Sequence, residues 1–327
     1  MRGRQGTAAG LAWACLLLAW PAAGAPAGDG FLGAGPPAHT LDTQFGATPA
    51  AQAKDPSVLD QRLRAAYVLS QASSATWVLQ QSFEEFDLSR RPVIPATGRL
   101  VPGSLWTVDT GAGYSRKLGE RREWGASASV GSASDQLYHG LRETTLRATG
   151  VYRMPSRGEN SWLFLLAYSN NRHFANNIPL PGAAYIVRSK AAGLDAAIGL
   201  PFLAVSYRPA PGWSGKLSIF GPDNLNAEVG CPLAGSAEAY AGFDWSQKEW
   251  LRADRADREE RLFFDRKRWI LGLRLPVWDS LRFDLSGAYE FNRRFYEDRR
   301  ARSSGASEAG LAAAWTVAAK LGMRWQP

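Results

Sequence analysis

Hydrophobic and polar residues alternate along much of the chain. Between Leu281 and Phe291 every second residue is apolar or Gly287, whereas the intervening positions include Arg282, Asp284 and Glu290. Successive side chains of a β-strand point to opposite faces, so this period of two predicts a strand with one apolar face and one charged face.

The alternation returns in several other parts of the chain. It covers residues 106–114, 124–130, 146–153, 269–275 and 311–325. Several of these segments reach the ~9–11 residues that a tilted transmembrane strand needs. Aromatic residues lie near both ends of the apolar faces, as at Trp315 and Trp325. Aromatic girdles at two membrane interfaces are expected to look like this.

Two kinds of connection separate the predicted strands. Tight turns are predicted at residues 119–122, 155–158, 209–212 and 276–279, and long charged loops at 252–261 and 296–305. Short turns at one end and long loops at the other are typical of outer-membrane barrels. We therefore predict an all-β fold, a transmembrane antiparallel β-barrel of about 12 strands. Residues 183–236 are hard to divide, so the range is about 10–14 strands.

A soluble exported β-sandwich is the alternative fold, because its strands also alternate. Three features disfavour it: the strands are long, tryptophan lies at strand ends, and the chain finishes in an amphipathic strand with Trp325 near its end. A mean hydropathy of −0.25 excludes a helical membrane protein. It does not exclude a barrel, in which only alternate residues face lipid.

The N-terminus has the three parts of a secretory signal peptide. Arg2 and Arg4 precede a short apolar run, and Ala23 to Ala25 supply small residues for cleavage. We predict a signal peptide at residues 1–25, a flexible Gly/Ala/Pro-rich leader at 26–60 and a barrel at 61–327. Cleavage leaves Cys231 as the one cysteine, so an intrachain disulfide is excluded.

The middle of the chain carries a more specific string. It consists of Tyr168-Ser-Asn-Asn-Arg-His173, Asn177-Ile-Pro-Leu-Pro-Gly182 and the following Tyr185. The string and the strands after it resemble an uncharacterised family of bacterial outer-membrane β-barrel domains from Gram-negative-type bacteria. The resemblance covers roughly residues 60–325. It implies an outer-membrane barrel and no assigned activity.

The polar strand faces supply candidate lumen residues. They are Arg147, Arg274, Arg282, Asp284, Glu290, Lys320 and Arg324. Such residues either line a water-filled pore with a modest anion preference or pair across the interior and close it. Residues 176–185 are a candidate infolded loop or an ordinary external one. Its residues of interest are Pro179, Pro181, Gly182 and Tyr185.

Catalytic and metal-binding patterns are weak. Ser169 and His173 share a strand face, but four residues at ~3.3 Å each place them about 13 Å apart. The few histidines and Cys231 do not have metal-ligand spacing. No glycine-rich phosphate loop is present. We therefore expect no enzyme, no cofactor and no metal.

Three functions remain, in this order. The first is a passive pore for small polar or anionic solutes, and the second is a non-conducting structural or surface-interaction barrel. The third is an outer-membrane lipid hydrolase. Expected partners are outer-membrane lipid, lipopolysaccharide and the barrel-assembly machinery, and nucleic acid is not expected. Lipopolysaccharide phosphates suit arginine-rich external loops. The sequence predicts no oligomeric state.

Overall fold

The computed structural model describes residues 38–119, 121–172, 175–209, 212–221, 224–233, 236–299 and 308–327. These residues form strands, turns and loops, without a helix. In this described part, no helix is long and apolar enough to cross a membrane. The predicted signal peptide and residues 26–37 of the predicted leader lie outside the described residues.

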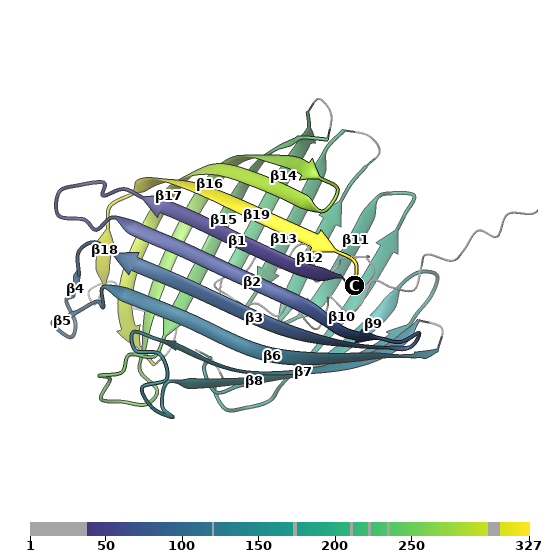
Figure 1. Cartoon of the computed structure of the whole chain (residues 1–327), viewed down its shortest axis with the longest axis horizontal. Coiled ribbons are helices and arrows are strands. Elements are labelled where there is room, and N and C mark those ends of the chain that lie inside the picture. The colour runs from purple at the N-terminus through teal and green to yellow at the C-terminus, as the bar shows by residue number, and fades with distance from the viewer. Residues whose placement is uncertain are drawn as a thin grey trace, which may run out of the picture.

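Almost all strands belong to one large antiparallel sheet (Figure 1). Its strands are β1 (His39–Thr48), β2 (Val58–Gln71), β3 (Ala75–Leu88), β6 (Ser104–Gly119), β7 (Arg122–Ser134), β8 (Thr144–Pro155), β9 (Ser161–Ser169), β10 (Leu180–Ser189), β11 (Leu194–Leu200), β12 (Phe202–Tyr207), β13 (Ser214–Phe220), β14 (Asn224–Pro232), β15 (Glu238–Trp250), β16 (Arg261–Trp278), β17 (Leu281–Asp298), β18 (Ala309–Leu311) and β19 (Ala314–Trp325). The short strands β4 (Val93–Ile94) and β5 (Arg99–Leu100) form a separate hairpin.

The sheet closes on itself. Each strand pairs with its neighbours along the chain, and β1 pairs with both β2 and β19. The strands β18 and β19 follow one another along β17 and share one place in the ring. The structure is therefore a closed ring of 16 antiparallel strands. Closure gives every strand of the ring a paired neighbour on each side, so the sheet has no edge strand.

The two ends of the barrel differ in their connections. His39 pairs with Trp325, so both chain segments meet at one end, which we call the turn end. All four turns predicted from the sequence lie at the turn end. The longer connections 89–103, 135–143, 170–179 and 251–260 lie at the opposite end, the loop end. The predicted division is confirmed for these turns and for the 252–261 loop; of the predicted loop at 296–305, residues 296–298 belong to β17 and residues 300–305 lie outside the described residues.

The predicted strand number is wrong: the barrel has 16 strands, not about 12. Five strands of six to ten residues, β10 to β14, lie between residues 180 and 232. Their alternation was hidden because several of these strands are apolar on both faces, as with the buried Ile186 and Ala197.

The predicted leader is also wrong for residues 39–60, which hold β1 and the start of β2. A closed single sheet also excludes the β-sandwich.

Candidate functional site

Contacts across the ring show which side chains point inward. Lys248 on β15 forms an ion pair with Glu84 on β3, although five strands separate them in the ring. Side chains so far apart can meet only through the interior. Strand pairing carries this assignment to neighbours, because paired residues share a face. The other face carries exposed residues such as Trp269, Leu271 and Val317.

A group of buried charges fills the interior toward the loop end. This interior ion cluster consists of Asp60, Arg62, Glu84, Lys248, Arg266, Glu290 and Arg293. Asp60 Oδ2 lies 2.8 Å from Lys248 Nζ and 3.1 Å from Arg266 Nη2. Glu290 Oε1 lies 3.2 Å from Arg266 Nη1. Buried charges need such partners, because desolvation of each ion is costly. The cluster joins β2 and β3 to β15, β16 and β17.

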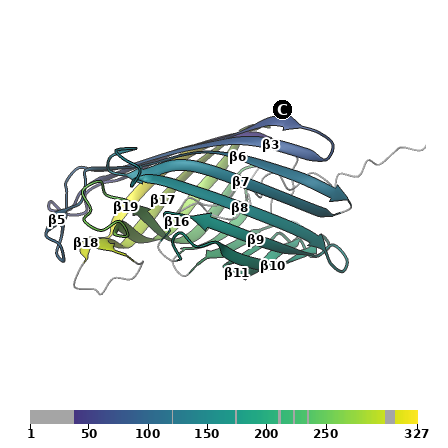
Figure 2. The ribbon, with the colours of Figure 1, turned by 90° about the horizontal axis from the view of Figure 1, so that it is seen from below.

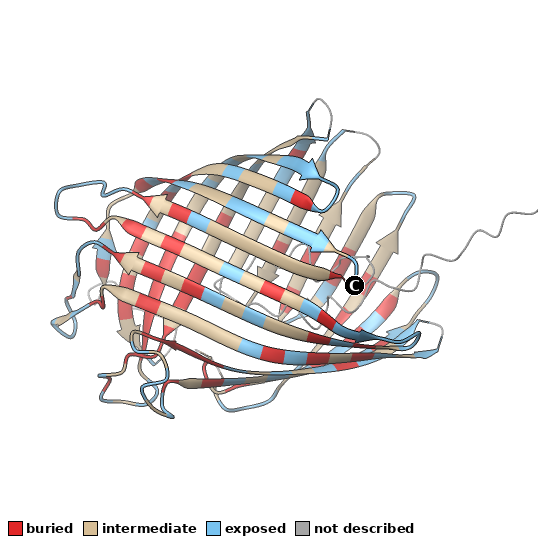
Figure 3. Ribbon diagram, in the orientation of Figure 1, coloured by how far each residue is buried: buried red, intermediate tan, exposed pale blue. Residues whose placement is uncertain are grey.

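An apolar core lies next to this cluster. Phe86 and Phe264 have ring centroids 5.0 Å apart, Phe264 and Phe295 are 4.5 Å apart, and Trp250 lies 5.6 Å from Phe86. The β3–β6 loop contributes Ile94 to the same core, together with Val101, and both are fully buried. Buried positions accordingly gather on these strands near the loop end (Figure 3). This half of the interior is packed like the core of a globular protein.

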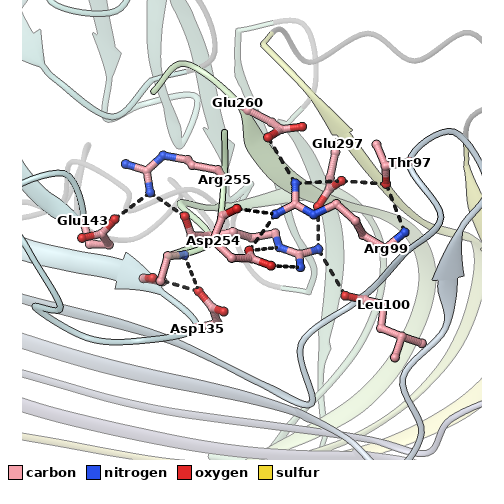
Figure 4. Close-up of polar contacts among 12 residues, drawn as sticks. Thr97, Arg99, Leu100, Asp135, Glu143, Asp254, Arg255, Glu260 and Glu297 are labelled. Atoms are coloured by element: carbon pink, nitrogen blue, oxygen red, sulfur yellow. Dashed lines mark hydrogen bonds and ion pairs between the residues drawn. The ribbon is translucent and has the colours of Figure 1, made fainter. Parts of the chain in front are cut away.

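Loops at the same end are tied together by arginines (Figure 4). This loop latch consists of Arg99, Glu143, Arg252, Asp254, Arg255, Glu260 and Glu297. Arg99 of the β4–β5 hairpin lies 2.7 Å from Asp254, and Arg252 lies 2.6 Å from Glu297. Arg255 joins Glu143 of the β7–β8 loop at 2.8 Å. Charge-assisted hydrogen bonds of this kind are about twice as strong as neutral ones.

Asp254 shows the electrostatics of the latch. Burial raises its pKa, but the hydrogen bonds and charges of Arg252 and Arg99 outweigh burial and hold the pKa below its usual range. Correspondingly, the pKa of Arg252 is raised by Asp254 and Glu297 despite its burial. Both groups are therefore charged at neutral pH. The interleaved arginines and acids of this loop therefore neutralise one another.

The interior is divided near the loop end. Leu251, just after β15, forms a parallel bridge with Ser134 at the end of β7, and the Leu251 N–H donates to the Ala133 carbonyl at 2.7 Å. The end of β15 thus meets β7 across the barrel. The packed half lies on the side of β16, β17, β19 and β1 to β6.

Below the ion cluster, the inward face is lined by smaller and paired residues. Ser127 and Ser129 on β7 lie opposite Thr149 and Arg147 on β8. On the opposite wall, Arg274 lies 3.1 Å from Asp284. Between these walls, β9 to β13 add a buried apolar patch that sequence reasoning missed. Its members include Leu163, Leu165, Ala184, Ile186, Ala197 and Phe202.

Most predicted lumen residues lie on this inward face with partners of opposite charge. Arg147 lies 3.1 Å from Asp109, and Lys320 lies 3.7 Å from Asp42. Arg274 contacts three carboxylates, namely those of Glu228, Glu238 and Asp284. Asp284 also accepts a hydrogen bond from the Tyr240 hydroxyl at 2.6 Å. Glu290 belongs to the interior ion cluster.

Two further predicted residues lie at the turn end. Arg282 pairs with Gly322 in the strand register and is exposed, and within the described residues it makes no ion pair. Arg324 is exposed as well, and its backbone N–H donates to the Ser280 carbonyl at 2.8 Å. The turn-end mouth therefore carries two arginines and Lys320, with Asp42 beside the lysine.

The predicted infolded loop is wrong. Pro181, Gly182 and Tyr185 belong to β10, and Pro179 directly precedes this strand. Its regular pairing with β9 and β11 prevents it from leaving the wall. The loop that does fold inward is the β3–β6 loop. In the sequence, the sign that this loop folds inward was its two apolar pairs, Val93-Ile94 and Leu100-Val101.

The residues weighed for chemistry are not assembled into a reactive site. The Ser169 hydroxyl donates to the Asn171 carbonyl and accepts from the Asn171 N–H, both at 3.1 Å. His173 lies outside the described residues. Among the residues described, no three His, Cys, Asp or Glu side chains are grouped to hold a metal ion.

No protein-family model and no curated protein matches the chain. The resemblance drawn from the Asn177–Gly182 segment therefore stays a prediction. Solved structures with a similar outline include the TodX monoaromatic hydrocarbon channel, 10% identical, covering 95% of this chain and 94% of that one, with a TM-score of 0.39. An outer membrane channel from Pseudomonas putida F1 is 9% identical, with 94% and 98% covered and a TM-score of 0.33.

The translocator domain of the autotransporter NalP from Neisseria meningitidis is 13% identical, with 89% of each chain covered and a TM-score of 0.31. The TM-scores of these three structures are all below 0.5. The architecture of this chain therefore rests on its own strand pairing.

Proposed function

We propose that the protein is an integral outer-membrane barrel that forms a narrow passive channel for small polar or anionic solutes. Two aromatic belts on its outward face support the membrane location. One includes Tyr289 and Trp315, with ring centroids 5.3 Å apart, and the other lies at the turn end. Trp315 and Trp325 are ten residues apart on β19, which is about 33 Å of strand and about 25 Å of height at a 40° tilt. An outer-membrane apolar band has this height.

The turn-end belt runs over several strands. Trp77 packs on Tyr114 at 4.7 Å, and Tyr114 packs on Trp124 at 5.3 Å. Trp162 and Tyr185 continue the belt, with centroids 4.9 Å apart. Rings of this kind are stable at the interface between headgroups and hydrocarbon. We accordingly propose outer-membrane lipid and lipopolysaccharide as surroundings, and the barrel-assembly machinery as the partner for insertion.

The size of the ring is the observation that carries the channel. Sixteen strands enclose more space than side chains fill, and barrels of about 16–18 strands leave an aqueous channel. The ion cluster and the apolar core pack across one half of the interior, so a passage would run along the side of β8 to β14, beside the buried apolar patch of that wall. Paired charges such as Arg274 with its three carboxylates suit water-filled surroundings and small polar solutes.

Single-channel conductance in a planar bilayer tests this proposal. We expect small steps with a modest anion preference, and Arg282→Ser is expected to lower that preference because this mouth arginine makes no described ion pair. Arg116→Ser is the matched control, since Arg116 is exposed on the outward face of β6. A folded, heat-modifiable protein without conductance would refute the channel, and equal effects of both variants would refute the role of Arg282.

One observation favours the second function, a non-conducting barrel that displays its loops. The interior ion cluster and the apolar core around Trp250 close half of the loop end, and the loop latch covers it. In that case Arg282→Ser has no conductance to alter. Detection of bound lipopolysaccharide without ion flux would then support the display function.

We also propose that the barrel is not an enzyme. Both hydrogen bonds of the Ser169 hydroxyl go to the backbone of Asn171, which supports a structural role for this serine. Activation of a serine nucleophile requires a general base within hydrogen-bond reach. Release of fatty acid from lipid vesicles is the test, and hydrolysis that Ser169→Ala abolishes would overturn this proposal.

A further inference from the structure

The barrel wall has very different heights on its two sides. The strands β11, β12 and β13 have 7, 6 and 7 residues, whereas β16 and β17 have 18 each. We call β11 to β13 the low wall. It lies on the opposite side of the ring from β3, and Figure 2 shows its neighbour β10 and the start of the wall at β11.

The low wall is too short for an ordinary outer membrane. A strand rises ~3.3 Å per residue, so the six residues of β12 extend about 20 Å, or about 15 Å in height at a 40° tilt. The apolar band of an outer-membrane barrel is about 25 Å tall. On β17, the outward positions from Leu281 to Phe291 span about 25 Å by the same calculation. The low wall therefore falls short by about 10 Å.

The outward face of the low wall is nevertheless suited to lipid. Leu200 is 79% exposed and Ile198 is 53% exposed. Tyr207 and Trp213 form an aromatic pair at the turn end of the wall, with centroids 5.4 Å apart, and so continue the turn-end belt. The other outward positions that strand pairing assigns are apolar or glycine. They are Leu194, Ala196, Leu203, Val205, Gly215, Leu217 and Ile219.

The shortfall lies at the loop end of the wall. The turn-end belt places Tyr207 and Trp213 at one membrane interface. At the other end, Pro201 alone connects β11 to β12, so no loop extends these two strands upward. In a flat bilayer the rim at Leu200 and Pro201 would lie inside the hydrocarbon of one leaflet. Turns exposed to hydrocarbon are strongly disfavoured, because their backbone polar groups lack partners there.

We infer that the lipid bilayer is thinned along the low wall, so that the leaflet at the loop end dips to meet its rim. This inference rests on the proposed membrane location. A short apolar surface is otherwise accommodated by snorkelling side chains or by oligomerisation. The outward positions of the wall carry no long charged side chain that could snorkel. The low wall is therefore in contact with a bilayer that is locally thinner than the surrounding membrane.

Area excludes a second copy as the occupant of the low wall alone. Three strands spaced ~4.8 Å apart make a face about 14 Å wide, and its height is about 15 Å. The face thus offers roughly 200 Å², whereas a stable interface buries about 800 Å² on each partner. A dimer held only by this wall would be too weak to persist.

Spin labels on single cysteines test the inference. The background is Cys231→Ser in the mature protein, which removes the one described cysteine. Labels replace Leu200 on the low wall and Leu271 on β16, which is 68% exposed and lies a similar distance from the turn end. In lipid vesicles, collisions with oxygen report hydrocarbon depth, and collisions with a water-soluble nickel chelate report the interface.

We expect the oxygen-to-nickel collision ratio at Leu200 to be several-fold lower than at Leu271. The difference is expected to shrink in lipids with shorter acyl chains, because a thin bilayer matches the low wall and brings the interface closer to Leu271. Equal ratios at both sites would show a flat bilayer and overturn the inference. Protection of Leu200 from both reagents would show a protein cover and would also overturn it. Water exposure at Leu271 would instead contradict the membrane location itself.

Discussion

Removal of a carboxylate from the interior ion cluster is expected to destabilise the barrel more than removal of its lysine. The cluster holds four cations, Arg62, Lys248, Arg266 and Arg293, against three carboxylates, Asp60, Glu84 and Glu290. Glu84→Gln leaves four buried cations with two carboxylates. Lys248→Met leaves three of each, because Arg266 remains on Asp60 and Arg62 remains on Glu84.

The charge balance sets the magnitudes. An unpaired buried charge typically costs about 3–5 kcal/mol, which is our estimate for Glu84→Gln. Lys248→Met loses charge-assisted hydrogen bonds but removes a buried cation that is 4% exposed, so its cost is about 1–3 kcal/mol. Both side chains are replaced by groups of similar volume, so cavity formation adds little to either value.

Urea titration of the barrel in lipid vesicles measures both variants. Tryptophan fluorescence and the heat-modifiable mobility of the folded barrel follow the same transition, and agreement between them shows that it is cooperative. We expect the midpoint of Glu84→Gln to fall well below that of Lys248→Met. A Lys248→Met variant as unstable as Glu84→Gln would refute the charge accounting. The double variant tests coupling, since contacting residues are not additive.

Three further predictions concern other parts of the structure. Trp250→Ala should cost about 3–5 kcal/mol in the same assay, because Trp250 is buried in the apolar core, and the lipid-exposed Trp269→Ala should cost clearly less. Gly193→Ala should cost about 1–3 kcal/mol, because φ is 62° and a Cβ would collide with the Arg208 carbonyl oxygen. The folded-state pKa of Asp254 is lowered, so its contribution to the loop latch is fully present above about pH 4 and is lost as the pH falls further. Amide protection factors of residues 251–260 should therefore be constant from pH 8 to 5 and drop in stronger acid, and a loss of protection toward pH 8 would contradict this assignment.

The sequence by itself determined the features that depend on one strand at a time. Period-two alternation in Leu281 to Phe291, aromatic residues at strand ends and the contrast between turns and loops follow from the surroundings of a single strand. Each strand has lipid or water on a given face, and its side chains alternate accordingly. Those features were sufficient to predict an all-β barrel, and the closed antiparallel ring confirms it.

The tertiary structure alone decided what depends on closure. The number of strands was hidden in residues 180–232, where apolar residues on both faces, as at Ile186, remove the alternation. The pairing of Lys248 with Glu84 joins strands that five other strands separate in the ring, and no local pattern encodes such a contact. The inward β3–β6 loop and the low wall also follow from the arrangement of the complete sheet. Which charges neutralise one another, and how tall each side of the barrel is, are therefore properties of the ring rather than of its strands.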